Sequence, residues 1–142
     1  MKKVVFIMLA LSIMMSVSCK STGNVTDETF ARIYSRYHGD LILDGAKSYT
    51  VKSGDTLVDI SRSHYNDPYY YPVIMLASKD VVSDPDKIQP GMVLTIPNLQ
   101  KNLNNVKARE SMKGVVKDCA AIEELRGRNA TAQGLKNKAA AL

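Results

Sequence analysis

The sequence predicts an α+β fold in which a strand, two helices and a second strand follow one another over residues 48–97, with a further helix on each side. Three observations support this prediction. Tyr49 and Val51 alternate with polar neighbours, as in a half-buried strand, and residues 92–96 form a second β segment. Two short stretches of helical spacing, separated by turn residues, lie between them. Apolar residues also recur at helical intervals before and after this block.

The chain begins with a segment typical of exported proteins. Lys2 and Lys3 form a positive start, and residues 4–17 are apolar apart from two serines. This run is shorter than the roughly 20 residues that a transmembrane helix needs. We therefore expect residues 1–18 to be a signal peptide that directs the protein to the cell envelope or periplasm.

The end of this segment, Ser16-Val17-Ser18-Cys19, resembles the lipobox of bacterial lipoproteins. The resemblance implies that Cys19 is acylated and anchors the mature protein to a membrane. The position three residues before the cysteine departs from the pattern, since Ser16 stands where Leu is usual. The alternative is an ordinary secretory signal with an incidental cysteine.

Residues 19–25 are polar and small, and we expect them to form a flexible tether. An N-terminal helix is expected within residues 26–47, with Thr26 as N-cap and two acidic residues at the positive end of the helix dipole. Residues 41–43 are also compatible with a short strand. The apolar stripe of this helix comprises Phe30, Ile33, Tyr34, Tyr37 and Leu41.

Turn residues divide the central block. Gly54-Asp55 ends the first strand, and Asp55 or Thr56 caps a helix that Asn66-Asp67-Pro68 ends. A second helix is expected over residues 73–78, with Pro72 in its first turn.

An acidic connection over residues 79–91 finishes in Pro90-Gly91, and the second strand follows it and ends at Pro97.

The C-terminal part is basic. Residues 98–142 carry nine basic and four acidic side chains, whereas residues 48–97 carry four basic and six acidic ones. The acidic balance of the central block argues against nucleic acid as a partner. Residues 98–128 predict an amphipathic helix that either packs on the central block or docks a protein partner or an anionic membrane surface. Residues 129–142 are expected to be a frayed helix or disordered.

The segments YTVKSGDTL at residues 49–57 and DPDKIQPGMVLTIP at residues 84–97, with two helices between them, resemble a LysM domain. The resemblance implies a βααβ module, in which a two-stranded antiparallel sheet carries both helices on one side. With the lipoprotein-like start, the whole chain resembles spirochaetal and other bacterial LysM lipoproteins. Val58 and Ser78 depart from the pattern, because a bulky residue such as Trp and an Asn often stand there.

The resemblance also implies non-covalent binding of glycans that contain N-acetylglucosamine, such as the glycan strands of peptidoglycan. A site for this sugar needs accessible backbone, a few polar side chains and a limited apolar surface. Gly54 lets the backbone approach a ligand, and Leu57 and Ile88 suit an apolar seat. The same residues also suit ordinary turns, caps and core, which would leave a scaffold without a ligand. The candidate glycan-binding residues are Gly54, Asp55, Thr56, Leu57, Asp86, Lys87, Ile88, Gln89, Pro90 and Gly91.

Other chemistry is not predicted. We see no nucleophile, base and orienting group in a recognisable pattern, so we expect no enzyme activity and no cofactor. Asp80, Asp84 and Asp86 lack the spacing of an EF-hand, and no metal site is expected. Cys119 lies at an apolar helical position and is interpreted as a small buried residue. The sequence thus predicts a lipid-anchored protein that links membrane to cell wall; the alternative is a LysM-fold module for protein interaction or ion sensing.

Overall fold

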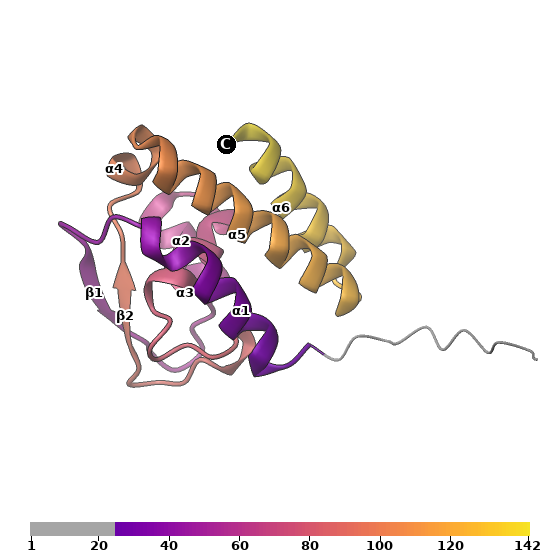
Figure 1. The fold of residues 1–142 in the computed structure, drawn as a ribbon. Helices are drawn as coiled ribbons and strands as arrows, with labels where there is room; N and C mark the ends of the chain where they lie inside the picture. The colour runs from indigo at the N-terminus through magenta and orange to yellow at the C-terminus, as the bar shows by residue number, and fades with distance from the viewer. Residues whose placement is uncertain (1–24) are drawn as a thin grey trace, which may run out of the picture.

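The computed structural model describes residues 25–142, so the predicted signal peptide, Cys19 and most of the tether lie outside the described residues. Its elements are mainly helical, and its one small sheet lies at an edge of the molecule (Figure 1). In chain order they are α1 (Asp27–Tyr37), the 3₁₀ turn η1 (His38–Asp40), β1 (Lys47–Thr50), α2 (Leu57–Tyr65), the 3₁₀ turn η2 (Pro68–Tyr70), α3 (Tyr71–Ala77), the 3₁₀ turn η3 (Pro85–Lys87), β2 (Val93–Ile96), α4 (Leu99–Asn104), α5 (Val106–Leu125) and α6 (Asn129–Ala141).

The two strands pair antiparallel, with Lys47 opposite Ile96 and Thr50 opposite Val93. Backbone hydrogen bonds continue the pairing by one step, because the N–H of Val51 donates to the carbonyl of Met92 over 2.8 Å. This sheet and the helices α2 and α3 give the βααβ order over residues 47–96, with flanking helices on both sides. The predicted α+β fold is therefore confirmed.

Helix α3 lies at the centre of the core, with all seven of its residues buried. It contacts α2 and β2 on the module side and α5 on the other side. It begins two residues earlier than the sequence predicts, because Pro72 occupies the first turn and Tyr71 is already helical. One hydrophobic cluster runs through this helix and joins Phe30 of α1 to Met112 and Leu135 of the C-terminal helices.

Helix α1 lies alongside α5 (Figure 1). Its predicted apolar stripe faces the core: Phe30, Ile33 and Tyr34 are buried. The hydroxyl of Tyr34 donates to the carbonyl of Val82 over 2.5 Å, which ties α1 to the connection between α3 and β2. The helix ends at Tyr37, and no strand forms at residues 41–43.

The C-terminal part differs from the single helix expected over residues 98–128. Asn105 interrupts it, because its side chain caps a new helix by accepting from the N–H of Ala108 over 3.0 Å. Asn98 caps the start of the first helix in the same way, by accepting from the N–H of Lys101 over 3.0 Å. The result is a short α4 and a long α5. Residues 129–141, expected to be frayed or disordered, form the regular helix α6. It folds back on α5 and buries Ala132, Leu135 and Ala139, which supplies the tertiary packing that its sequence alone does not reveal.

Two helical glycines allow tyrosines to pack closely. A methyl group at Gly114 of α5 would collide with the ring of Tyr37, and one at Gly134 of α6 would collide with the ring of Tyr69. The first contact joins α5 to α1, and the second joins α6 to η2. Gly114 therefore does not break its helix; it provides the space in which α1 docks.

Within residues 25–142, no helix combines the length and the apolar character that crossing a bilayer requires.

Candidate functional site

The first loop, residues 51–56 between β1 and α2, is held by its own side chains. Asp55 accepts hydrogen bonds from the backbone N–H of Lys52 over 2.8 Å and from the hydroxyl of Tyr49 over 2.7 Å. These two bonds stabilise the carboxylate and lower the pKa of Asp55. Gly54 has a φ of 87°, which favours glycine, and a Cβ there would meet only open space. Asp55 thus shapes the loop, and the backbone at Gly54 is exposed at its tip.

The start of α2 is capped by Thr56. Its hydroxyl oxygen accepts from the N–H of Asp59 over 3.1 Å, and the hydroxyl donates to the Asp59 carboxylate over 2.7 Å. Leu57, the next residue, is only 2% exposed and belongs to the core. The sequence predicted Thr56 as a ligand donor and Leu57 as an apolar seat. In the structure the hydroxyl already has two partners, and Leu57 serves as a floor under the site.

The second loop, residues 78–92 between α3 and β2, carries the other candidates. Asp84 caps η3 by accepting from the N–H of Asp86 over 2.9 Å. Gln89, Pro90 and Gly91 are exposed, and Ile88 is half-buried against the core. The N–H of Gly91 donates to the carbonyl of Val51 over 2.9 Å, so the two loops are joined at their base. This bond places the two predicted halves of the glycan site side by side.

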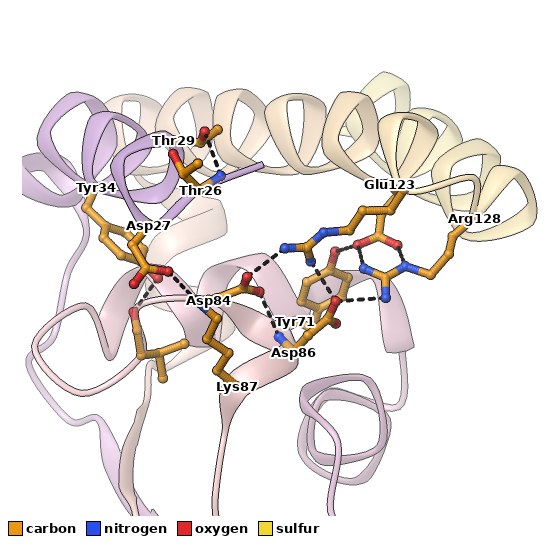
Figure 2. A network of polar contacts seen from close by, with 12 residues as sticks. Thr26, Asp27, Thr29, Tyr34, Tyr71, Asp84, Asp86, Lys87, Glu123 and Arg128 are labelled. Atoms are coloured by element: carbon orange, nitrogen blue, oxygen red, sulfur yellow. Dashed lines mark hydrogen bonds and ion pairs between the residues drawn. The ribbon is translucent and has the colours of Figure 1, made fainter. Parts of the chain in front are cut away.

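Ion pairs connect the second loop to helices outside the βααβ module. Arg126, in the turn after α5, bridges Asp84 and Asp86 over 2.7 Å each, and Arg128 reaches Asp86 over 2.9 Å (Figure 2). Arg128 also pairs with Glu123 of α5. The Arg126–Asp84 pair is largely shielded from water, with side chains 16% and 6% exposed. The guanidinium of Arg126 also lies 5.4 Å from the centre of the Phe30 ring.

A second pair continues this network toward α1. Lys87 contacts Asp27 at the start of α1 over 2.6 Å (Figure 2). Two of the predicted ligand residues, Asp86 and Lys87, are thus engaged with flanking helices. Their charges are compensated within the protein and do not stand free for a ligand.

A hollow of about 220 Å³ lies where the first loop, the second loop and the C-terminal helices meet. Leu57, Val58 and Pro85 contribute apolar atoms to it. Of the ten predicted residues, Thr56, Leu57 and Asp86 line this hollow, whereas Gly54, Asp55 and residues 87–91 do not. The complete lining is Thr56, Leu57, Val58, Tyr71, Pro85, Asp86, Glu123, Arg128 and Thr131.

Glu123, Arg128 and Thr131 also line the hollow, although the sequence does not predict them as site residues. Glu123 is buried and accepts a hydrogen bond from the hydroxyl of Tyr71 over 3.2 Å. Burial, together with the nearby Glu123 carboxylate, raises the pKa of Tyr71, so that its hydroxyl remains a donor. These residues follow the module by 26 or more positions in the chain, and no local pattern points to the hollow.

Four tyrosines near the end of α2 pack against other parts of the protein and do not form an exposed surface on which a sugar could stack. They are Tyr65, Tyr69, Tyr70 and Tyr71. Tyr65 donates to the carbonyl of Pro97 over 2.8 Å, Tyr69 lies against Gly134, and Tyr71 is buried. Lys138 of α6 lies 4.6 Å from the centre of the Tyr70 ring. Tyr69 and Tyr70 contact α6, because α6 folds back beside η2.

Potential nucleophiles and metal ligands in the described residues lie in environments that do not suit those roles. Cys119 is buried, and burial raises the pKa of its thiol, so it is not poised as a nucleophile. In the part of the chain that the structure describes, no group of three or more His, Cys, Asp and Glu side chains is arranged to hold a metal ion.

Comparison with known proteins assigns the central block. Residues 49–97 match the LysM domain family. The potassium binding protein Kbp of Escherichia coli is 53% identical over 49 residues, which cover 34% of this chain and 33% of Kbp. An uncharacterized protein of Deinococcus radiodurans is 45% identical over 53 residues, which cover 37% of this chain and 20% of that protein. The matches thus span a third or less of each relative. No solved structure matched the chain significantly.

Proposed function

We propose that this chain binds the N-acetylglucosamine-containing glycan strands of peptidoglycan through its LysM domain, and does so without catalysis. The observation that carries this proposal is the LysM domain at residues 49–97, a type of module that generally binds peptidoglycan and is not catalytic. The two loops joined by the Gly91–Val51 hydrogen bond support it, since they bring exposed backbone at Gly54 and residues 89–91 to one edge of the sheet.

The arrangement suits weak binding. Apolar surface beside the loops is limited, and the charged side chains already have partners, so a short oligosaccharide should bind in the micromolar to millimolar range, about −8 to −4 kcal/mol. Retention on an insoluble polymer can still be firm, because a membrane-tethered protein binds many copies of the ligand at high effective concentration.

Retention on purified, insoluble peptidoglycan tests this proposal. Gln89 is exposed, and Gln89→Trp should block the second loop without disturbing the core. Gln133→Trp places the same side chain on an exposed position of α6 and serves as the matched control. We expect retention of the wild-type chain and of the control, and loss of retention with Gln89→Trp. Failure of the wild-type chain to bind at low salt would contradict the proposal.

We also propose that export and acylation at Cys19 place the protein in the cell envelope, where it links a membrane to the wall. The charged start, the apolar run of residues 4–17 and the lipobox-like end support this placement. Intact-mass measurement of protein extracted from membranes tests it: an acylated Cys19 is expected, and a free thiol there would contradict it.

The outer face of the C-terminal helices is the candidate surface for a further partner. Lys113 and Lys117 of α5 border a groove of about 500 Å³ against α6, together with Ala121 and Ala140. Asp118 and Glu124 also line it, but they form ion pairs with Arg36 and Lys136, so Lys113 and Lys117 give the rim its positive charge. Such a groove suits an acidic protein segment or an anionic membrane surface. Charge reversal at Lys113 and Lys117 should weaken any such association and leave peptidoglycan retention unchanged, which co-sedimentation with anionic vesicles and with the polymer would measure.

A second candidate function is potassium-responsive binding, favoured by the 53% identity with Kbp over 49 residues. Potassium is a hard cation that carbonyl oxygens can hold, and such a site needs no carboxylate cluster. Thermal unfolding in potassium chloride and in sodium chloride at equal ionic strength tests this candidate. A melting temperature that rises with potassium alone would support it, and identical curves would remove it.

A further inference from the structure

The C-terminal hairpin, formed by α5, the turn Arg126–Arg128 and α6, lies against the second loop of the LysM domain. Arg126 and Arg128 come from the turn and reach Asp84 and Asp86 across the interface (Figure 2). These pairs join residues about 42 positions apart in the chain. The hairpin therefore has one defined position relative to the loops.

That position makes the hairpin a wall of the hollow next to the loops. Arg128 and Thr131 line it from the hairpin side, opposite Thr56 and Val58 of the LysM domain. Its volume of about 220 Å³ is below the roughly 300–1,000 Å³ of sites for drug-sized ligands, so it suits a single sugar unit.

The chemistry of the walls matches that of a sugar ring. Leu57, Val58 and Pro85 offer an apolar floor, and Thr131 adds a hydroxyl at the rim. Arg128 donates three of its five guanidinium N–H groups to Glu123 and Asp86, which leaves two for a ligand at the rim. Both side chains are only half-buried, and the Thr131 hydroxyl has no hydrogen bond to another described side chain that would occupy it. A hydroxyl-rich ring placed on this floor would meet donors and acceptors at its edge.

The charges around the hollow favour an uncharged ligand. Three carboxylates (Asp84, Asp86 and Glu123) surround two guanidinium groups (Arg126 and Arg128), and every guanidinium already has a carboxylate partner. These five groups together carry one net negative charge, which would repel a carboxylate on the ligand. A neutral N-acetylhexosamine unit meets no such repulsion.

We propose that Arg128 and Thr131 are specificity-determining residues of the glycan site, which the C-terminal hairpin extends beyond the LysM domain by one neutral sugar unit. This inference rests on the proposed function, because it adds a subsite to the same glycan site. It makes the hairpin a ligand-contacting element as well as a packing element.

Binding of an N-acetylglucosamine tetramer tests the inference, measured by calorimetry on the chain from residue 20 onward, which contains every residue of the described core. Thr131→Trp fills the hollow and should weaken binding at least tenfold. Gln133→Trp, two positions further along α6 and exposed, carries the same side chain outside the hollow and should bind like the wild-type chain.

Melting temperatures and a second variant separate a blocked site from a disturbed fold. Thr131→Val has the same shape and size as the wild-type residue, removes the hydroxyl and should weaken binding several-fold with an unchanged melting temperature. In amide spectra of the wild-type chain, the tetramer should shift the signal of Thr131 and leave that of Gln133 in place.

The outcomes distinguish the two proposals. A wild-type chain that binds the tetramer, together with Thr131 variants that are folded and bind equally well, would overturn the subsite and leave the LysM function standing. A wild-type chain that binds neither the tetramer nor peptidoglycan would overturn both.

Discussion

The LysM domain and the C-terminal helices differ in almost every property that a sequence displays. The domain has short elements, tight turns and a net charge of −2 over residues 48–97, whereas residues 98–142 are helical and carry +5. The match to the LysM family covers residues 49–97. Yet the two regions share one hydrophobic core, in which α3 lies between β2 and α5. A recognisable module can therefore share its core with neighbouring helices that lie outside the family match.

Truncation after Pro97 is the strongest test of this dependence. Removing α4 to α6 would expose one face of α3 and delete buried residues such as Met112, Val115 and Leu135. Each large buried side chain is worth about 1.5–3 kcal/mol, against a typical total stability of about 5–15 kcal/mol. We expect the truncated chain to lose cooperative thermal unfolding by circular dichroism. A truncated chain that melts like the full one would show that the domain is autonomous.

Arg126→Ala should have the next largest effect. It leaves the buried Asp84 carboxylate without its partner, and breaking such a pair destabilises a protein by about 3–5 kcal/mol. Arg62→Ala is the matched control, because the Arg62–Asp59 pair is exposed and worth at most about 1 kcal/mol. Urea unfolding measures both variants. Equal losses of unfolding free energy in the two variants would mean that the Arg126 pairs contribute no more than an exposed surface pair.

Gly134→Ala tests the contact between α6 and the LysM domain. Alanine normally stabilises a helix interior by about 1 kcal/mol relative to glycine. Here the added methyl group collides with Tyr69, and overpacking costs about 1–3 kcal/mol, so we expect a net loss of stability. In a Tyr69→Ala background the same substitution should become stabilising. A double-mutant cycle from urea unfolding gives both signs, and stabilisation in the wild-type background would contradict the close contact.

Tyr49→Phe should have the smallest effect, confined to the first loop. Asp55 is held in its charged form first by the Lys52 N–H and then by the Tyr49 hydroxyl, so its pKa lies below the ordinary 3.8. The stabilisation is therefore present above the ordinary pKa and is lost as the pH falls through the lower, folded-state pKa. Removing the hydroxyl should raise the pKa of Asp55 toward 3.8. Carboxyl chemical shifts followed against pH measure this change, and an unaltered pKa would exclude the bond.

Short-range patterns predicted much of the LysM domain. Gly54, Pro72 and Pro90-Gly91 act through their own backbone preferences, so the turns and the order of strands and helices could be read locally. The strand pairing followed from the family resemblance. The glycan-binding role of the listed residues stays a prediction. The two predicted loops do meet, but Asp55 and Thr56 hydrogen-bond within their own turn, and Asp86 and Lys87 form ion pairs with residues of the flanking regions.

The C-terminal region shows where local patterns stop being informative. The apolar spacing predicts a helix with one buried face, but it does not predict which part of the protein covers that face. Gly114 and Gly134 resemble helix-weakening residues in the sequence, and their role is visible only once Tyr37 and Tyr69 are in place. The tail is expected from its sequence to be a frayed helix or disordered for the same reason, since α6 is stabilised by packing on α5 and not by its own composition.

The chain thus carries in its linear order the identity of the LysM domain, the position of its two loops and the export-like start. Those features depend on the backbone preferences and periodicity of neighbouring residues. The hairpin wall, the Arg126 bridge and the hollow beside the second loop exist only in the folded molecule. They join residues some 40 positions apart, and such contacts are selected by the packing and charge of the whole core and not by any segment within it.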